Sequence, residues 1–296
     1  MTNTVRWSLF LGLPILIAIV VVIKLATHRS VNVNEYPIHR TVKYSFTVTN
    51  PSNHLIRKSE LWVYAPVKEN AFQQLANLHS NYPYKLSNDD KGNQRMMFVI
   101  ENIPPYATRT ITVTASLNLA DQGNRIDKIN SEDYLSDNKL IGLTNNHIKR
   151  VAQSLKADRQ KDTAHQIYNW INRNIKKSGY IRYDMGAPEA LKTKSGDCTE
   201  FMYLFSALAR ANRIPTRNMA GFVAKENGIL KSAEYHNWNE AYLDGVWYLI
   251  DTDKQVFMEK PSNYIAMRSI EGSSQDQSVD SQSFFSSSAD IQVSMN

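Results

Sequence analysis

The dipeptide Asp244-Gly245 restricts the fold more than any other feature of this sequence, because it is the turn typical of a two-residue β-hairpin. Residues 234–242 before it alternate like a strand, and residues 246–250 after it form the return run. A two-residue turn fixes the register of the two strands, so that Leu243 opposes Val246. The sequence therefore predicts which side chains of this hairpin share a face.

Counting back along this register brings a histidine and a carboxylate together. Trp238 opposes Asp251, and His236 opposes Asp253, so all four side chains are expected on one face. Asp251 lies one diagonal step from His236, close enough to accept a hydrogen bond from the imidazole and set its tautomer. Asp253 is the alternative partner if the hairpin stays regular that far. Because strand ends fray, we favour Asp251.

The one cysteine of the chain, Cys198, lies where a helix is predicted to begin. Gly196 breaks the preceding structure, and Asp197 with Glu200 forms a capping-box pattern. Apolar residues then recur at helical spacing, namely Phe201, Leu204, Phe205 and Leu208. Near a helix N-terminus the positive end of the dipole lowers the pKa of a thiol, and free backbone N–H groups can hold an oxyanion.

A buried structural cysteine is the alternative interpretation, since free cysteines often pack as small apolar residues. That role predicts a position inside the apolar stripe, whereas Cys198 sits at the cap beside Asp197 and Thr199. Cys198, His236 and Asp251 thus each occupy the local structure that a thiol nucleophile, its base and an orienting carboxylate need. We expect acyl-transfer chemistry on amide or ester carbonyls.

Metal and cofactor chemistry is not expected. A single cysteine excludes an intrachain disulfide and the paired-cysteine zinc patterns. The acidic stretch 89–93 lacks the ligand spacing of an EF-hand, so a hairpin turn is predicted there. The net charge of +6 comes from Lys and Arg spread along the chain, which does not indicate nucleic-acid binding.

The N-terminus has the composition of a membrane helix. Residues 7–23 carry no charged side chain, and a helix of that length reaches about 25 Å, near the minimum for a span. Leu25 and Ala26 extend it, because Lys24 can snorkel to the interface. A cleaved signal peptide is the alternative, but no small-x-small site follows. We expect a retained anchor at residues 1–25, whose balanced flanking charges do not indicate its orientation.

The remaining pattern predicts an ordered succession of regions. A polar tether (26–37) precedes several short alternating strands (38–118) that suggest an antiparallel β-sandwich, with residues 70–79 as an inserted helix. A polar linker (119–145) leads to a region of helices and strands (146–270). The Ser- and Gln-rich tail (271–296) is expected to be mostly disordered, with Ile291 and Val293 as a possible final edge strand.

Roughly residues 146–270 resemble the transglutaminase-like superfamily. The matching motifs are Gly196-x-Cys198-x-Glu200-Phe201, Arg213-Ile214-Pro215-Thr216-Arg217 leading to Gly221-Phe222, His236-x-Trp238-Asn239-Glu240, and Gly245-x-Trp247-x-x-x-Asp251. The resemblance implies an α+β papain-like core, with Cys198 as nucleophile, His236 as general base and acid, and Asp251 as orienting carboxylate. Weaker upstream matches resemble the β-sandwich that often precedes this domain in bacterial members. Thr252 departs from the Pro or Ala common after the triad Asp.

The resemblance also implies the setting of the reaction. A protein or peptide is the expected substrate, with hydrolysis slightly favoured over cross-linking, because the acceptor depends on a pocket that the sequence does not describe. Tyr183 matches an aromatic residue that either serves the oxyanion site or simply packs. Family habit places such a domain outside the cytoplasm, anchored in a bacterial inner membrane. The alternative function is a non-catalytic membrane-tethered binding or assembly module that retains the three residues.

Overall fold

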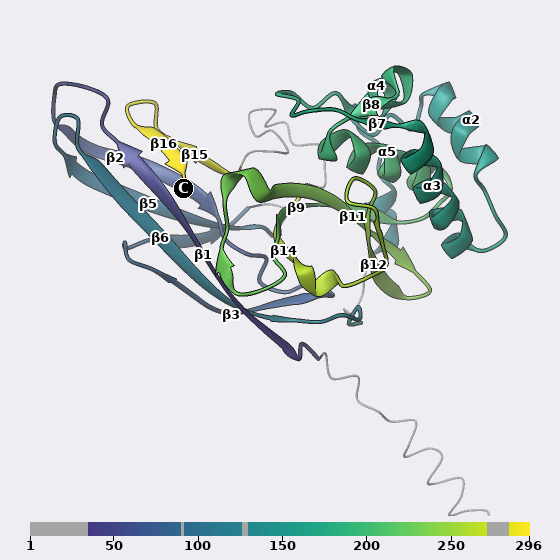
Figure 1. Ribbon diagram of the computed structural model, residues 1–296, viewed down its shortest axis with the longest axis horizontal. Helices are drawn as coiled ribbons and strands as arrows, with labels where there is room; N and C mark the ends of the chain where they lie inside the picture. Colours follow the sequence, from purple (N-terminus) through teal and green to yellow (C-terminus); the bar gives the residue numbers. More distant parts are fainter. Residues whose placement is uncertain (1–34, 90–91, 126–129, 271–283) are drawn as a thin grey trace, which may run out of the picture. The chain divides into compact units, whose positions relative to one another are not determined.

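The computed structural model describes residues 35–89, 92–125, 130–270 and 284–296, and residues 35–296 form one compact unit. The predicted anchor and most of the tether lie outside the described residues. Within the described ranges, no helix is long and apolar enough to cross a membrane. The chain has a mixed α+β fold that is rich in sheets (Figure 1).

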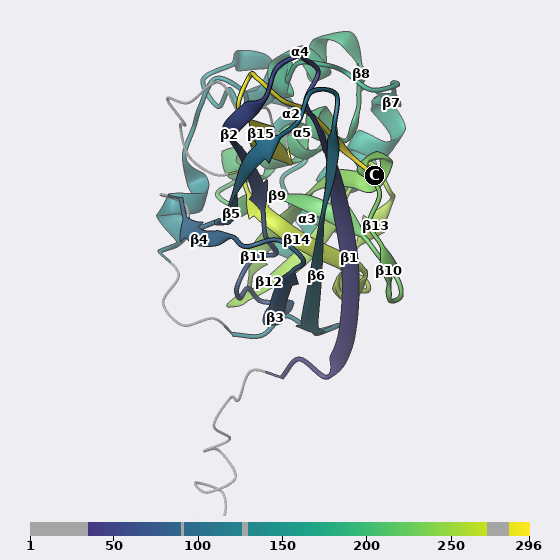
Figure 2. The same cartoon turned by 90° about the vertical axis from the view of Figure 1, so that its left-hand side faces the viewer.

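Two largely antiparallel sheets form the N-terminal part and enclose a shared core (Figure 2). Buried residues alternate with more exposed ones along most of the strands at 38–49, 94–103 and 108–119, as the sequence pattern predicts. The first sheet contains β10 (Gly228–Ile229), β1 (Ile38–Thr49), β6 (Thr108–Leu119) and β3 (Gln73–Ser80), with β16 (Gln292–Met295) also paired to β1. The second contains β15 (Phe285–Ser287), β2 (Ile56–Tyr64), β5 (Gln94–Ile103) and β4 (Lys85–Asn88).

Two segments of this part differ from their sequence-based prediction. Residues 70–79 do not form a helix, because β3 pairs along β6 from Gln73 onward and this pairing outweighs local preference. The described end of the chain, 284–296, is ordered, since β15 pairs with β2 and β16 pairs with β1. The final strand predicted around Ile291 and Val293 is thus present as β16, which contains Val293, and the rest of the predicted tail, 271–283, lies outside the described residues. Phe284 and Ile291 are both buried in the shared core and fix these strands.

The second part combines four helices with a five-stranded sheet. The helices are α2 (Asn146–Ser154), α3 (Gln160–Asn174), α4 (Gly186–Thr193) and α5 (Cys198–Ala211), and the sheet order is β13 (Val256–Phe257), β12 (Val246–Asp251), β11 (Tyr235–Leu243), β9 (Thr216–Val223) and β14 (Tyr264–Ser269). Short elements complete it, namely β7 (Lys176–Lys177), β8 (Ser195–Gly196), η1 (Ser131–Leu135), η2 (Ser232–Glu234) and η3 (Pro261–Asn263).

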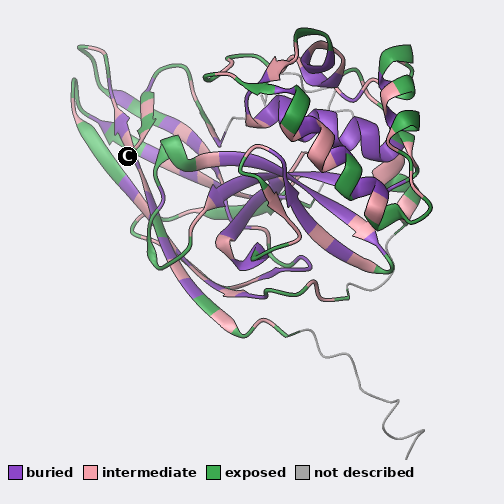
Figure 3. Cartoon of the chain, turned by 45° about the vertical axis from the view of Figure 1, so that its right-hand side comes forward, coloured by how far each residue is buried: buried purple, intermediate pink, exposed green. Residues whose placement is uncertain are grey.

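Helix α5 is the centre of the second part. Nearly all of its residues are buried, as expected for a helix that is apolar on most of its circumference (Figure 3). It packs against α2, α3 and α4 as well as against β9 and β11. All four residues of the predicted apolar stripe are buried in this core, namely Phe201, Leu204, Phe205 and Leu208. Cys198 is the first residue of this helix, so the packing of α5 fixes the position of the cysteine.

Candidate active site

The capping interactions predicted for α5 hold the cysteine at the first helical position. The Asp197 side chain accepts a hydrogen bond from the Thr199 backbone N–H at 2.9 Å, and the Glu200 carboxylate accepts one from the Asp197 N–H at 3.3 Å. Asp197 satisfies a helix-terminal donor that would otherwise be unpaired. Cys198 follows with a partly exposed side chain, so a reagent or substrate can reach the sulfur.

The hairpin has the predicted register, with Leu243 opposite Val246 and Asn239 opposite Ile250. His236 Nε2 lies 2.7 Å from Asp251 Oδ2, and both residues are almost completely buried. Because a carboxylate can only accept, Nε2 carries the proton of this bond and Nδ1 is left for the thiol. Asp253, the alternative partner, is turned away from this role by an ion pair with Lys177.

The electrostatics of His236 favour its protonated form. Burial, the largest single influence, lowers the pKa of His236, but it is outweighed by the charge and hydrogen bond of Asp251 and by a hydrogen bond and charge from Cys198. Together these contacts raise the pKa of His236 to about 9. The cysteine, the imidazole and the carboxylate therefore form one connected chain of interactions.

Both oxygens of Asp251 have further donors. The Lys254 backbone N–H donates to Oδ1 at 2.9 Å, and the Tyr264 hydroxyl donates to Oδ2 at 2.8 Å. The sequence analysis did not identify Tyr264 as a site residue. The apolar run from Tyr264 to Met267 could have indicated a buried strand, but no local pattern shows that this strand reaches the hairpin.

Helix α5 also fixes the loop that precedes α4. The Ile181 N–H donates to Asp197 Oδ2 at 2.8 Å, and the Met185 N–H donates to Glu200 Oε1 at 2.9 Å. Tyr183 is 70% exposed on this loop, with the Arg182 guanidinium over its ring. Its role at an oxyanion site stays a prediction, because its described contact is with Arg182 rather than with Cys198 or His236.

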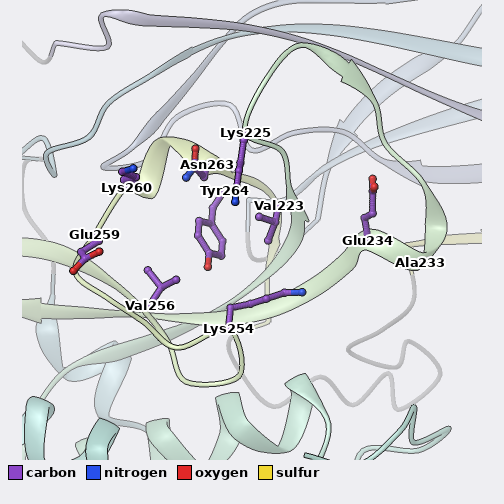
Figure 4. Close-up of a pocket in the computed structure, with 10 residues that line it drawn as sticks. All are labelled: Val223, Lys225, Ala233, Glu234, Lys254, Val256, Glu259, Lys260, Asn263 and Tyr264. Atoms are coloured by element: carbon purple, nitrogen blue, oxygen red, sulfur yellow. The ribbon is translucent and has the colours of Figure 1, made fainter. Parts of the chain in front are cut away.

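A hollow of about 730 Å³ lies next to residues that contact Asp251, but Cys198, His236 and Asp251 are not among the residues that line it. Figure 4 shows the Tyr264 ring projecting into it between Val223 and Val256. Two of the lining residues, Tyr264 and Lys254, are the ones that hydrogen-bond Asp251. Its charged lining is mixed, with Lys225, Lys254 and Lys260 beside Glu234 and Glu259. In the described part of the chain, no cluster of His, Cys, Asp and Glu has the arrangement of a metal site.

Together, a cysteine at a buried helix start and a histidine–aspartate pair on a hairpin define an α+β protein of the transglutaminase-like fold. Residues 149–252 match the family model described as the transglutaminase-like superfamily. This match agrees with the resemblance found in the sequence motifs.

Individual proteins similar to this chain cover different shares of it. The UPF0252 protein of Methanocaldococcus jannaschii is 30% identical over 138 residues, which are 42% of this chain. This chain spans only 39% of the length of that relative. A solved candidate cysteine protease from Cytophaga hutchinsonii has a TM-score of 0.58 at 14% identity, covering 88% of this chain and 91% of the other. The periplasmic domain of TgpA from Pseudomonas aeruginosa has a TM-score of 0.38 at 16% identity, covering 72% and 88%.

Proposed function

We propose that this chain is a membrane-anchored thiol enzyme that transfers or hydrolyses acyl groups at amide bonds of a protein or peptide. The observation that carries the proposal is the 2.7 Å contact between His236 Nε2 and Asp251 Oδ2, at a site where Cys198 also raises the pKa of His236. In this assignment Cys198 is the nucleophile, His236 the general base and acid, and Asp251 the carboxylate that orients the imidazole.

The proposed reaction has two steps. The Cys198 sulfur gives its proton to His236 and attacks the carbonyl carbon, forming a tetrahedral oxyanion that backbone N–H groups at the start of α5 can stabilise. The C–N bond breaks as His236 protonates the leaving amine, and a thioester on Cys198 remains. Water or a second amine, deprotonated by His236, then attacks the thioester, and the thiol is released with a carboxylic acid or a new amide.

The choice between hydrolysis and transfer depends on the group that attacks the thioester. We give hydrolysis the preference, and the description of the Cytophaga hutchinsonii neighbour as a candidate cysteine protease is in line with it. The hollow is the proposed place for substrate, because Tyr264 and Lys254, which hydrogen-bond Asp251, line it and because it offers groups of both charges.

The proposed setting is the outer side of a bacterial inner membrane, with the apolar segment 7–23 as a single-pass anchor. Protease treatment of intact spheroplasts is the test. Cleavage of the region that contains Cys198 without lysis is expected. Protection of that region until lysis would reverse the proposed orientation.

The reaction itself is tested by trapping the acyl-enzyme. The full chain is incubated with a peptide pool, quenched in acid and weighed by mass spectrometry. An adduct on the peptide that contains Cys198, absent from Cys198→Ala, is expected. A wild-type chain that forms no adduct, and whose Cys198 reacts with iodoacetamide no faster than glutathione does at pH 7, would instead favour a non-catalytic binding or assembly module.

A further inference from the structure

The contact between Tyr264 and Asp251 joins strands that are not neighbours. Strand β14 is three positions from β12 in the sheet order, with β9 and β11 between them. In a flat sheet that separation is about 14 Å, which is more than a tyrosine and an aspartate can bridge. The hydroxyl nevertheless lies 2.8 Å from Asp251 Oδ2, so the sheet curls until its β14 edge faces the end of β12 (Figure 1).

Tyr264 is held rigidly in that position. Its side chain is buried, and its ring packs edge-on against Trp238 at a centroid distance of 5.1 Å. Burial, followed by the charge of Asp251, raises the pKa of Tyr264. The phenol therefore remains neutral at physiological pH and keeps the proton that it donates to the carboxylate.

The N-terminal sheets fix the strand that carries this tyrosine. The Gln73 side-chain amide, from β3, donates to the Ala266 carbonyl at 3.0 Å and accepts from the Ala266 N–H at 2.9 Å. The Asn93 amide makes the same pair of contacts with Ser269, at 3.0 and 2.7 Å. Two amide side chains thus clamp the backbone of β14 just beyond Tyr264.

The two oxygens of Asp251 accept hydrogen bonds from different parts of the chain. Oδ1 is held by the Lys254 N–H, which belongs to the turn directly after Asp251 and moves with it. Tyr264 is the only described donor to Asp251, apart from His236 itself, that comes from a different part of the sheet. Without it, the carboxylate can rotate about its own side-chain bonds while keeping the local Lys254 contact.

We propose that Tyr264 is a positioning residue of the Cys198–His236–Asp251 site, whose hydroxyl fixes the Asp251 carboxylate against the His236 imidazole. This inference rests on the proposed function for its catalytic meaning, but the geometry that it predicts can be measured without any substrate. Tyr264 acts through Asp251 and takes no part in bond making.

Titration of the His236 ring by NMR is the direct test, using the full chain in mild detergent and assigning the signal with His236→Asn. Tyr264→Phe removes only the hydroxyl. Losing a hydrogen bond that orders a charged acceptor corresponds to roughly one pKa unit, so the pKa of His236 is expected to fall by about that amount. The other titratable groups near this contact are Asp251, Asp253, Tyr168 and Cys198, and all remain in the variant.

Tyr84→Phe is the matched control, because its hydroxyl donates to the Leu78 carbonyl in the N-terminal part of the chain. It is expected to leave the His236 titration unchanged. An unchanged His236 pKa in a folded Tyr264→Phe variant overturns the proposal. A raised pKa also overturns it, because the hydroxyl would then only attenuate the charge of Asp251. If circular dichroism shows that Tyr264→Phe is unfolded, Tyr264→Trp is the second variant, because its indole keeps an N–H donor. This variant must restore both the fold and the titration of His236. Failure to restore them counts against the positioning role.

A parallel measurement separates this inference from the proposed function. The rate of Cys198 alkylation by iodoacetamide is recorded from pH 5 to 10 in wild type, Tyr264→Phe and Tyr84→Phe. We expect Tyr264→Phe to shift the part of the pH–rate profile that follows His236 by about one pH unit, and Tyr84→Phe to leave the profile unchanged. If the wild-type thiol is unreactive while the His236 titration shifts as expected, the proposed function fails and the positioning role of Tyr264 stands.

Discussion

Lys177 Nζ lies 2.9 Å from Asp253 Oδ2. Asp253 lies two residues after Asp251, the last residue of β12, and the two carboxylates have different partners. Asp253 faces a lysine, whereas Asp251 accepts the hydrogen bond from His236. The sequence pattern had left both acids open as partners of the imidazole. Substituting each aspartate in turn can therefore show which of the two orients the imidazole.

Asp251→Asn should lower turnover by on the order of 10³-fold or more and should slow Cys198 alkylation at pH 7, because an amide can present an N–H to the imidazole and favour the wrong tautomer. Asp253→Asn is the matched control and should stay within about threefold, since Asp253 pairs with the largely exposed Lys177 and the contact between His236 and Asp251 is kept. Rates are compared by mass spectrometry of the alkylated chain. The reverse ranking of the two variants would transfer the orienting role to Asp253.

Cys198→Ala should abolish activity with little loss of stability. The side chain lies at a helix end and is only partly buried, so we expect a change in the free energy of unfolding of less than about 1 kcal/mol. Circular dichroism and urea unfolding measure the fold, and the acyl-enzyme assay measures the activity. An unfolded variant would indicate that the thiol is mainly a packing element.

The His236–Asp251 pair should make stability depend on pH with a definite sign. The folded pKa of His236, about 9, lies above its ordinary value of 6.5, so the folded state binds a proton more tightly than the unfolded state. The resulting stabilisation is complete below about pH 6.5 and is lost as pH rises through about 9. A shift of this size corresponds to roughly 3 kcal/mol.

Urea unfolding at several pH values checks this dependence, with His236→Asn as the reference chain. The stability difference between wild type and His236→Asn should shrink from pH 6 to pH 10. A difference that grows with pH would mean that burial dominates and that the neutral imidazole is preferred in the folded state.

Gln73→Met should destabilise the chain, because Gln73 is buried and its amide is paired with Ala266 and Val67. The Ala266 N–H would lose its partner, at a cost of about 1–3 kcal/mol. Gln74→Met, at the next and more exposed position of β3, should change the free energy of unfolding by less than about 0.5 kcal/mol. Equal effects in urea unfolding would argue against the clamp on β14.

Much of the candidate site could be predicted because it depends on short-range geometry. The Asp244-Gly245 turn determines the hairpin register, and the period of two then places His236 and Asp251 on one face. The capping pattern around Asp197 likewise determines where α5 starts, and with it the position of Cys198. These features involve residues close together in the chain, whose local conformations leave few alternatives.

The tertiary structure alone decided which residues from distant parts of the chain meet. Sheet curvature brings Tyr264 to Asp251, Gln73 reaches a strand that is 193 residues away, and pairing with β6 makes a strand of residues 73–80. The physical reason is that long-range pairing is selected by packing of the whole chain, and no local pattern encodes the curvature of a sheet or the partner of its edge. The sequence by itself determined that a helix starts at Cys198 and which residues of the hairpin share a face with His236, whereas the folded chain determined what holds them in place.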